Sequence, residues 1–181
     1  RVRSVTADLG RRFEVDPASR LFDPALAGGA LLDLGVYAVW FVLRFGGEPT
    51  QVRALGTVGP TGVDEQASIA MLGHDDVLMT ATTTMASFTA SRAAIIGEEG
   101  VIVVDGRFPM PAPVQLYDRD YRPVDRFEDP TGLVGHDGLA REAVHVAACV
   151  AAGLAESSAH PLAAAIAQLR VIDAARAAVL G

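Results

Sequence analysis

Asp33 and Tyr37 place a carboxylate and a phenol inside an otherwise apolar stretch, "GGALLDLGVYAVWFVLRFGGEP", at residues 28–49. Residues four apart on a helix are neighbours on one face, so the spacing predicts that these two side chains lie together. Gly35 stands between them, although glycine costs about 1 kcal/mol relative to alanine inside a helix. The three residues are typical of a catalytic face at which another chemical group closely approaches the backbone.

The same residues have a second interpretation that involves no chemistry. Asp33 would lie in the first helical turn, where the helix dipole favours an anion. Tyr37 would be an amphipathic residue at the rim of the core. The spacing alone leaves both interpretations open.

Hydrophobic periodicity predicts the other elements of the chain. A weak strand pattern at 1–9 and an irregular segment at 10–27 precede the helix, which is predicted over 28–47 and ends at a Gly-Gly-Glu-Pro stop signal. Seven strand patterns follow, at 50–58, 64–72, 77–85, 91–97, 100–106, 113–118 and 123–127. Two helices complete the chain, at 139–154 and 161–180.

Two of the predicted strands show which face of the sheet is covered. Apolar residues fall on alternate positions in both, at Ala67, Ile69 and Met71 and then at Val77, Met79 and Ala81. Such alternation is typical of an antiparallel sheet with one packed face. The predicted fold is therefore α+β: one domain over residues 1–181, with an open-faced, mostly antiparallel sheet and its helices on one face.

Composition excludes several classes of partner. The chain has 181 residues, a net charge of -7 and a pI near 5.0, which offers no basic surface for nucleic acid or for an anionic membrane. The apolar stretch at 30–45 is shorter than the roughly 20 residues of a membrane span, so none is expected. Cys149 is the only cysteine and is interpreted as a small buried hydrophobe without an acid-base partner, consistent with a cytoplasmic protein.

Motifs for cofactors and metals are missing. Neither G-x-G-x-x-G nor G-x-x-x-x-G-K-[ST] occurs, so the chain has no recognisable nucleotide cradle of its own. The cluster at His74 to Asp76 is interpreted as a hairpin turn. Glu142 and His145 have the spacing of half a di-iron motif, but no second copy exists, so no metal site is predicted.

Three further residues are candidates for a substrate pocket. Arg20 and Phe22 lie in the loop "SRLFDP" before the helix, and His136 lies in "GHDG". The alternative is that the first two are packing or solvated loop residues and that His136 is an exposed turn residue.

The amino-acid sequence resembles the C-terminal domain of the Gfo/Idh/MocA oxidoreductases, in particular the branch with trans-dihydrodiol dehydrogenase and glucose-fructose oxidoreductase. The resemblance covers nearly the whole chain in order. The stretches that carry it are "RLFDPALAGGALLDLGVYAVWFVLRFGGEPTQVRA", "GVDEQASIAML", "SRAAIIGEEGVIVVDGRFPMPAPV" and "EAVHVAACVAAGLAESSAHPLAAAIAQLRVIDAARAAV".

The resemblance implies a role for each candidate residue. In that family an N-terminal Rossmann domain binds NAD or NADP, and a C-terminal helix carries Asp-x-x-x-His or Asp-x-x-x-Tyr. Tyr37 would be the acid/base for a sugar, polyol or dihydrodiol, and Asp33 would orient the substrate or tune the phenol. Gly35 would border the cofactor, and Arg20, Phe22 and His136 would border the substrate.

The resemblance also implies what this chain lacks. The family's catalytic lysine belongs to a Glu-Lys-Pro motif of the Rossmann domain, and all 15 basic residues here are arginines. We therefore expect the chain alone to bind neither cofactor and to be inactive. It is also expected to form at least a homodimer through the uncovered sheet face, by the strands between 50 and 105. The alternatives are a non-catalytic dimerisation or ligand-binding module of the same fold, and the second domain of a semialdehyde or homoserine dehydrogenase.

Overall fold

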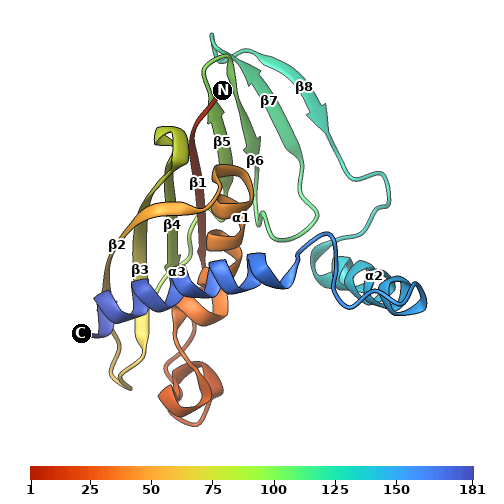
Figure 1. Cartoon of the computed structure of the whole chain (residues 1–181). Coiled ribbons are helices and arrows are strands. Elements are labelled where there is room, and N and C mark those ends of the chain that lie inside the picture. The colour runs from red at the N-terminus through yellow and green to blue at the C-terminus, as the bar shows by residue number, and fades with distance from the viewer.

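A single eight-stranded sheet forms the body of the molecule, and the computed structural model describes residues 1–181 (Figure 1). The spatial order of the strands is β2-β3-β4-β1-β5-β6-β7-β8. Their bounds are β1 Val2–Gly10, β2 Pro49–Val58, β3 Asp64–Gly73, β4 Leu78–Thr84, β5 Ala93–Gly97, β6 Gly100–Val104, β7 Val114–Asp118 and β8 Pro123–Phe127. All the predicted strands are present, and the predicted fold class is confirmed.

The first strand of the chain lies in the middle of the sheet. β1 pairs in parallel with β4 and antiparallel with β5, and all the other pairs are antiparallel. The parallel pair is possible because a helix and the β2–β3–β4 meander separate β1 from β4 along the chain. The sheet is therefore mostly antiparallel, as predicted.

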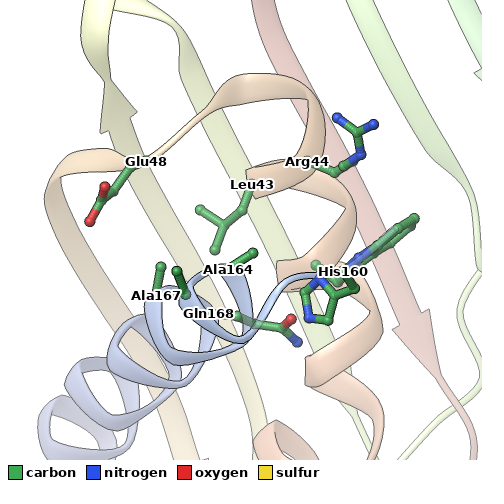
Figure 2. Close-up of a pocket in the computed structure, with 9 residues that line it drawn as sticks. Leu43, Arg44, Glu48, His160, Ala164, Ala167 and Gln168 are labelled. Carbon is green, nitrogen blue, oxygen red and sulfur yellow. The ribbon is translucent and has the colours of Figure 1, made fainter. Parts of the chain in front are cut away.

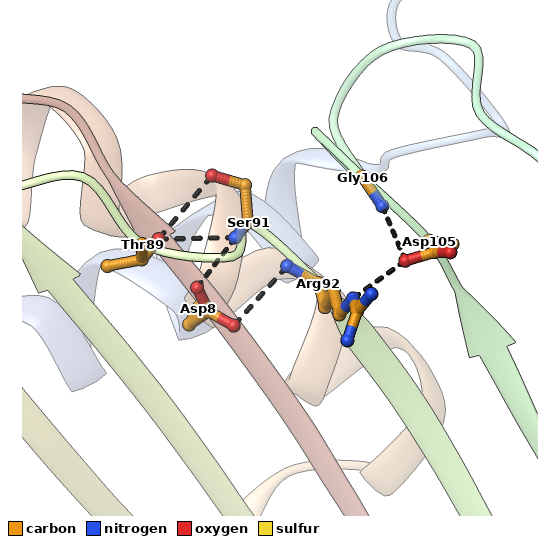
Figure 3. Close-up of polar contacts among 6 residues, drawn as sticks. All are labelled: Asp8, Thr89, Ser91, Arg92, Asp105 and Gly106. Atoms are coloured by element: carbon orange, nitrogen blue, oxygen red, sulfur yellow. Dashed lines mark hydrogen bonds and ion pairs between the residues drawn. The ribbon is translucent and has the colours of Figure 1, made fainter.

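The junction between β4 and β5 is held by Asp8 of β1 and by Asp105, the residue after β6 (Figure 3). Asp8 on β1 accepts hydrogen bonds from the backbone N–H groups of Ser91 at 2.8 Å and Arg92 at 3.3 Å. Arg92 donates in turn to Asp105 at 2.6 Å. Ser91 has a φ of 52°, so the carboxylate fixes a strained backbone turn at this junction.

Two helices cover one face of the β1–β4 part of the sheet (Figure 1). These are α1, Val36–Gly46, which packs on β1 and β4, and α3, Leu162–Leu180, which packs on β2 and β3. The third helix, α2, Leu139–Ala151, lies away from the sheet and contacts the short η5 turn, Gly135–Gly138. The remaining short turns are η1 Arg20–Phe22, η2 Pro24–Leu26, η3 Leu31–Gly35 and η4 His74–Asp76.

The hydrophobic core lies between the sheet and these two helices. The six alternating residues predicted to face it are all buried: Ala67, Ile69, Met71, Val77, Met79 and Ala81. α1 adds four buried residues, and α3 adds Val171, Ile172 and Ala175. The end of α1 comes so close to the sheet that a Cβ on Gly46 would meet Met79, which is why this position has no side chain.

The segment Pro24–Gly46 is long and apolar enough to cross a membrane, by length and composition alone. It is 23 residues long with a hydropathy high enough for a membrane-spanning helix, whereas the prediction of no span considered only residues 30–45. Half of the most apolar 18-residue stretch in this segment is buried inside the protein. Core helices of globular proteins meet the same criterion, and this segment supplies much of the core described above.

Cys149 also differs from the prediction. It is only partly buried, because α2 does not pack on the sheet. His145, one turn earlier, brings its Nε2 to within 3.5 Å of the Cys149 sulfur and to 2.7 Å from the Ser157 hydroxyl. The expected absence of an acid-base neighbour was therefore wrong: residues four apart on α2 face each other.

Candidate functional site

Asp33 and Tyr37 lie on either side of a junction between two kinds of helix. Asp33 belongs to η3, Leu31–Gly35, which is a π-helical turn, and Tyr37 is the second residue of α1. The predicted continuous α-helix over 28–47 was wrong in this respect. A π turn takes up an extra residue within a helix and is frequent at functional sites, because it turns side chains away from their α-helical positions.

Asp33 is held by an arginine of the preceding loop. Nη2 of Arg20 donates to Oδ1 of Asp33 at 2.8 Å, and the Asp33 side chain is 19% exposed. The other carboxylate oxygen of Asp33 has no hydrogen-bond partner. The structure thus brings together two predicted site residues and leaves one acceptor available for a ligand.

The short turns before the helix explain how Arg20 reaches this position. Ser19 caps η1 by accepting from the Leu21 N–H at 3.4 Å. Asp23 ends η1 and caps η2 by accepting from the Ala25 N–H at 2.8 Å. Two successive capped turns fold the loop back onto the start of the helix, so that Arg20 meets a residue 13 positions later.

Tyr37 presents its ring to solvent. The residue is 48% exposed and its hydroxyl has no hydrogen-bond partner. No cation of this chain pairs with it: Arg20 pairs with Asp33, and Arg44, two helical turns further on, lies over the ring of Phe45 at 5.9 Å. The phenol is therefore accessible, and its acid-base neighbours must come from outside the chain.

Gly35 packs against the sheet. It is buried, and a Cβ at this residue would lie 3.3 Å from the Thr83 methyl group of β4 and 3.4 Å from the Ala30 carbonyl oxygen. The hydroxyl of Thr83 donates to that same carbonyl at 3.3 Å. The space that a side chain at Gly35 would need is therefore taken by the sheet, and its predicted contact with a cofactor stays a prediction.

The two remaining candidates lie elsewhere. Phe22 is buried in a small cluster with Ala30, Val63 and Met85, so it is a packing residue, the alternative left open by the sequence. His136 is exposed in η5, the turn beside α2, and forms no hydrogen bond or ion pair with Asp33. The structure does not bring either side chain to the Asp33 carboxylate.

Asp64 is a residue that sequence reasoning missed. It is fully buried at the start of β3, and its Oδ2 accepts from the Leu31 N–H of the π turn at 2.6 Å. Its Oδ1 lies 3.9 Å from Nε of Arg176 on α3. Burial raises the pKa of Asp64, an effect that the Leu31 hydrogen bond and the Arg176 charge oppose. Asp64 thus ties the start of the helix to β3 and α3.

Gly29 provides the space that this carboxylate needs. It has a φ of 120°, a conformation that favours glycine, and a Cβ there would collide with Oδ1 of Asp64. The available signal in the sequence was an aspartate at the first position of an apolar strand, combined with the Gly28-Gly29 pair. Neither predicts burial by itself.

Comparison with known proteins identifies relatives of the chain. A family model described as the GFO/IDH/MocA C-terminal domain matches residues 1–103. The trans-1,2-dihydrobenzene-1,2-diol dehydrogenase of Danio rerio is 36% identical over 160 residues, which are 87% of this chain and 47% of the relative. That of Mus musculus is 30% identical over 187 residues, covering 98% of this chain and 54% of the relative. The chain spans about half the length of the curated relatives it matches.

Solved structures share the fold. An aldose-aldose oxidoreductase from Caulobacter crescentus, complexed with glycerol, matches with a TM-score of 0.77 and 21% identity over 98% of this chain and 53% of its own. A 3-ketoreductase from Actinomadura kijaniata in complex with NADP matches with a TM-score of 0.74 and 21% identity, over 98% of this chain and 52% of its own.

Proposed function

Because the chain belongs to the GFO/IDH/MocA C-terminal domain family, we propose that it is the substrate-facing part of an NAD(P)-dependent oxidoreductase acting on a sugar, polyol or dihydrodiol. The relatives named dihydrodiol dehydrogenases, and the aldose-aldose oxidoreductase and NADP-bound 3-ketoreductase that share this fold, support the proposal. The observation that carries it is the site itself: an accessible phenol at Tyr37, four residues after a carboxylate at Asp33 that an arginine already holds in place.

The dinucleotide is assigned to a Rossmann domain outside this chain. Its pyrophosphate needs a glycine-rich turn at a helix N-terminus, and no such motif occurs between residues 1 and 181. The one glycine predicted to border the cofactor, Gly35, is packed against Thr83. We therefore propose that the chain alone neither binds the cofactor nor turns over substrate.

The residues of this chain would act on the proton and on the position of the substrate. Tyr37 would exchange a proton with the substrate oxygen at its phenolic hydroxyl, since general acid-base groups must lie within hydrogen-bond reach of the proton they move. A free phenol titrates near 10, so the proposal requires a cation from the other domain to favour the phenolate. The unpaired oxygen of Asp33 would accept from a neighbouring substrate hydroxyl, with Arg20 fixing the orientation of the carboxylate.

The uncovered face of the sheet supports an additional role in assembly. On that face β3 and β4 carry Ser68, Ala70, Thr80 and Thr82, with Leu72 and Leu78 at one end, and the Ser68 and Thr82 hydroxyls lie 3.3 Å apart. Leu55 on β2 is 82% exposed on the same face. We propose a homodimer in which a second copy covers this face of the strands between residues 50 and 105. A non-catalytic dimerisation or ligand-binding module is the second candidate function, and it rests on this face alone.

A substrate screen on the full-length protein tests the enzymatic proposal. Purified protein is mixed with NAD or NADP and with sugars, polyols and trans-dihydrodiols, and reduction of the nicotinamide is followed by absorbance. We expect turnover with one of these classes in the cytoplasmic range of pH. Absence of turnover with all of them, from protein that binds the cofactor, would favour the non-catalytic module.

A further inference from the structure

One peptide unit at the start of the π turn is held from both sides by the sheet. The N–H of Leu31 donates to Oδ2 of Asp64 on β3 at 2.6 Å. The carbonyl of Ala30, which belongs to the same peptide unit, accepts from the Thr83 hydroxyl on β4 at 3.3 Å. β3 and β4 are neighbours in the sheet, so side chains of two adjacent strands hold the two ends of a single planar amide group.

Both contacts lie in the interior of the protein. Asp64 is 0% exposed and Thr83 is 2% exposed. The N–H groups of the first helical turn have no acceptor within the helix, and a buried N–H without a partner is costly. Asp64 supplies the missing acceptor, and Thr83 fixes the carbonyl at the other end. The two residues thus form a clamp on the peptide, and neither of them can touch a substrate.

Both partners of the Arg20–Asp33 ion pair are connected to the clamped peptide through Gly29. The N–H of Gly29 donates to the carbonyl of Leu21, the neighbour of Arg20, at 3.0 Å. The carbonyl of Gly29 accepts from the Asp33 N–H at 3.2 Å. Gly29 directly precedes the clamped peptide in the chain. A shift of that peptide would therefore move Arg20 and Asp33 relative to each other.

The other end of the π turn is fixed by α3. Nε2 of Gln168 donates to the carbonyl oxygen of Val36, the first residue of α1, at 2.7 Å. Figure 2 shows the Gln168 side chain reaching from α3 toward α1. Because both ends of the turn are held, a change in the clamp must be taken up within Leu31–Gly35, the segment that carries Asp33.

We propose that Asp64 and Thr83 are positioning residues of the proposed site: the clamp sets the register of the π turn and so the direction of the Asp33 carboxylate. This role rests on the proposed function, in which the unpaired oxygen of Asp33 binds a substrate hydroxyl. π turns are rare compared with α-helical turns, so loss of the clamp should return the segment to the α-helical register. A register change of one residue rotates a side chain by about 100° around the helix axis, which would turn Asp33 away from Arg20.

Hydrogen exchange in the full-length protein tests the clamp without any substrate. Thr83→Val removes the hydroxyl and keeps the shape of the side chain. Exchange of residues 29–35, followed by mass spectrometry, should become about tenfold faster, with no change in β3. Thr83→Ser keeps the hydroxyl and should restore the wild-type rate.

Thr84→Val is the matched control for this experiment. Thr84 is also buried on β4, but its hydroxyl accepts from the Ala86 N–H at 3.0 Å and makes no contact with the clamped peptide. Its loss should leave the exchange of residues 29–35 within about twofold of wild type.

Kinetics with a substrate found in the screen test the positioning role itself. Asp33 binds substrate in the proposed function and Tyr37 moves the proton. Thr83→Val and Asp64→Ala should therefore raise KM about tenfold or more, the loss expected for a hydrogen bond to a charged group, with kcat within about threefold of wild type. Thr83→Ser and Asp64→Asn, which keep the hydroxyl and the acceptor, should recover most of the loss.

A double variant shows whether the clamp acts through Asp33. In an Asp33→Asn background, Thr83→Val should raise KM by less than about twofold more, because effects that pass through one group do not add. Fully additive effects on KM would contradict the positioning role.

Two further results would overturn the proposal, and they separate it from the proposed function. Unchanged exchange of residues 29–35 in Thr83→Val, or a wild-type KM in Thr83→Val beside a raised KM in Asp33→Asn, would remove the positioning role and leave the proposed function intact. Wild-type KM and kcat in Asp33→Asn would contradict the proposed role of Asp33 and the positioning role together.

Discussion

The two ends of the sheet differ in what covers them. β1 to β4 are packed under α1 and α3, and almost every buried residue of the chain belongs to this part. β5 to β8 and α2 form the other part, in which Phe127 on β8 and Val146 and Val150 on α2 are more than half exposed. The family match, at residues 1–103, covers the sheet from β1 to most of β6. The candidate site therefore lies on the part of the chain that supplies its own core.

Core substitutions should show the largest difference between the two parts. Ile172→Ala on α3 removes a fully buried side chain beneath the sheet and should lower the free energy of unfolding by about 2–5 kcal/mol. Val150→Ala on α2, where the residue is 71% exposed, should change it by less than about 0.5 kcal/mol. Urea unfolding of both variants measures the contrast, and equal losses would show that α2 is packed in solution.

Asp64 should give the next largest effect. Asp64→Ala leaves the buried Leu31 N–H without an acceptor and should cost about 1–3 kcal/mol, whereas Asp64→Asn keeps an acceptor and should cost less. Thermal unfolding at pH 7 provides the comparison. If alanine and asparagine were equivalent, the hydrogen bond to the π turn would contribute nothing.

The pH dependence of the same residue has a definite sign. Burial raises the pKa of Asp64 above its ordinary value of 3.8, so the folded state binds the proton more tightly than the unfolded state. The contribution of this group to stability is fully present below pH 3.8 and is lost as the pH rises through the folded pKa. Wild type should therefore lose stability relative to Asp64→Asn on raising the pH from below 3.8, and a relative gain over that interval would contradict the stated cause.

A charge introduced on the part of the sheet formed by β1 to β4 should weaken dimerisation, whereas the same charge on α2 should not. Leu55→Glu puts a charge on the uncovered face of β2 and should shift the proposed dimer toward monomer, seen by light scattering at micromolar concentration. Val150→Glu is the control, because it adds the same charge to α2. A wild-type mass near 18.9 kDa would contradict the dimer outright.

The strands and the covered face were predictable because their signals are local. Period-two alternation at residues such as Ile69 and Met79 reports directly on burial of one face. The parallel pairing of β1 with β4 could not be predicted, since it depends on where the β2–β3–β4 meander places its last strand. The exposure of α2 to solvent could not be predicted either, because its sequence is as apolar as that of a packed helix.

The site was predictable in its residue types and less so in its geometry. The four-residue spacing of Asp33 and Tyr37 was visible, but the π turn between them was not, because the register of the helix is fixed by its fit against β4. Arg20 was named for its loop, and only the folded loop shows that it binds Asp33. Asp64 went unnoticed because the burial of a carboxylate depends on residues distant in the sequence, here Leu31 and Arg176.

The proposed role of Tyr37 in proton transfer is tested by one pair of variants of the full-length protein. Tyr37→Phe and Tyr117→Phe remove the same hydroxyl from the two parts of the molecule; Tyr117 lies on β7, stacked on Tyr121 at 4.5 Å between ring centroids. With a substrate found in the screen, kcat should fall by about 10²- to 10⁴-fold for Tyr37→Phe and stay near wild type for Tyr117→Phe. A Tyr37→Phe enzyme with the wild-type kcat would contradict the claim.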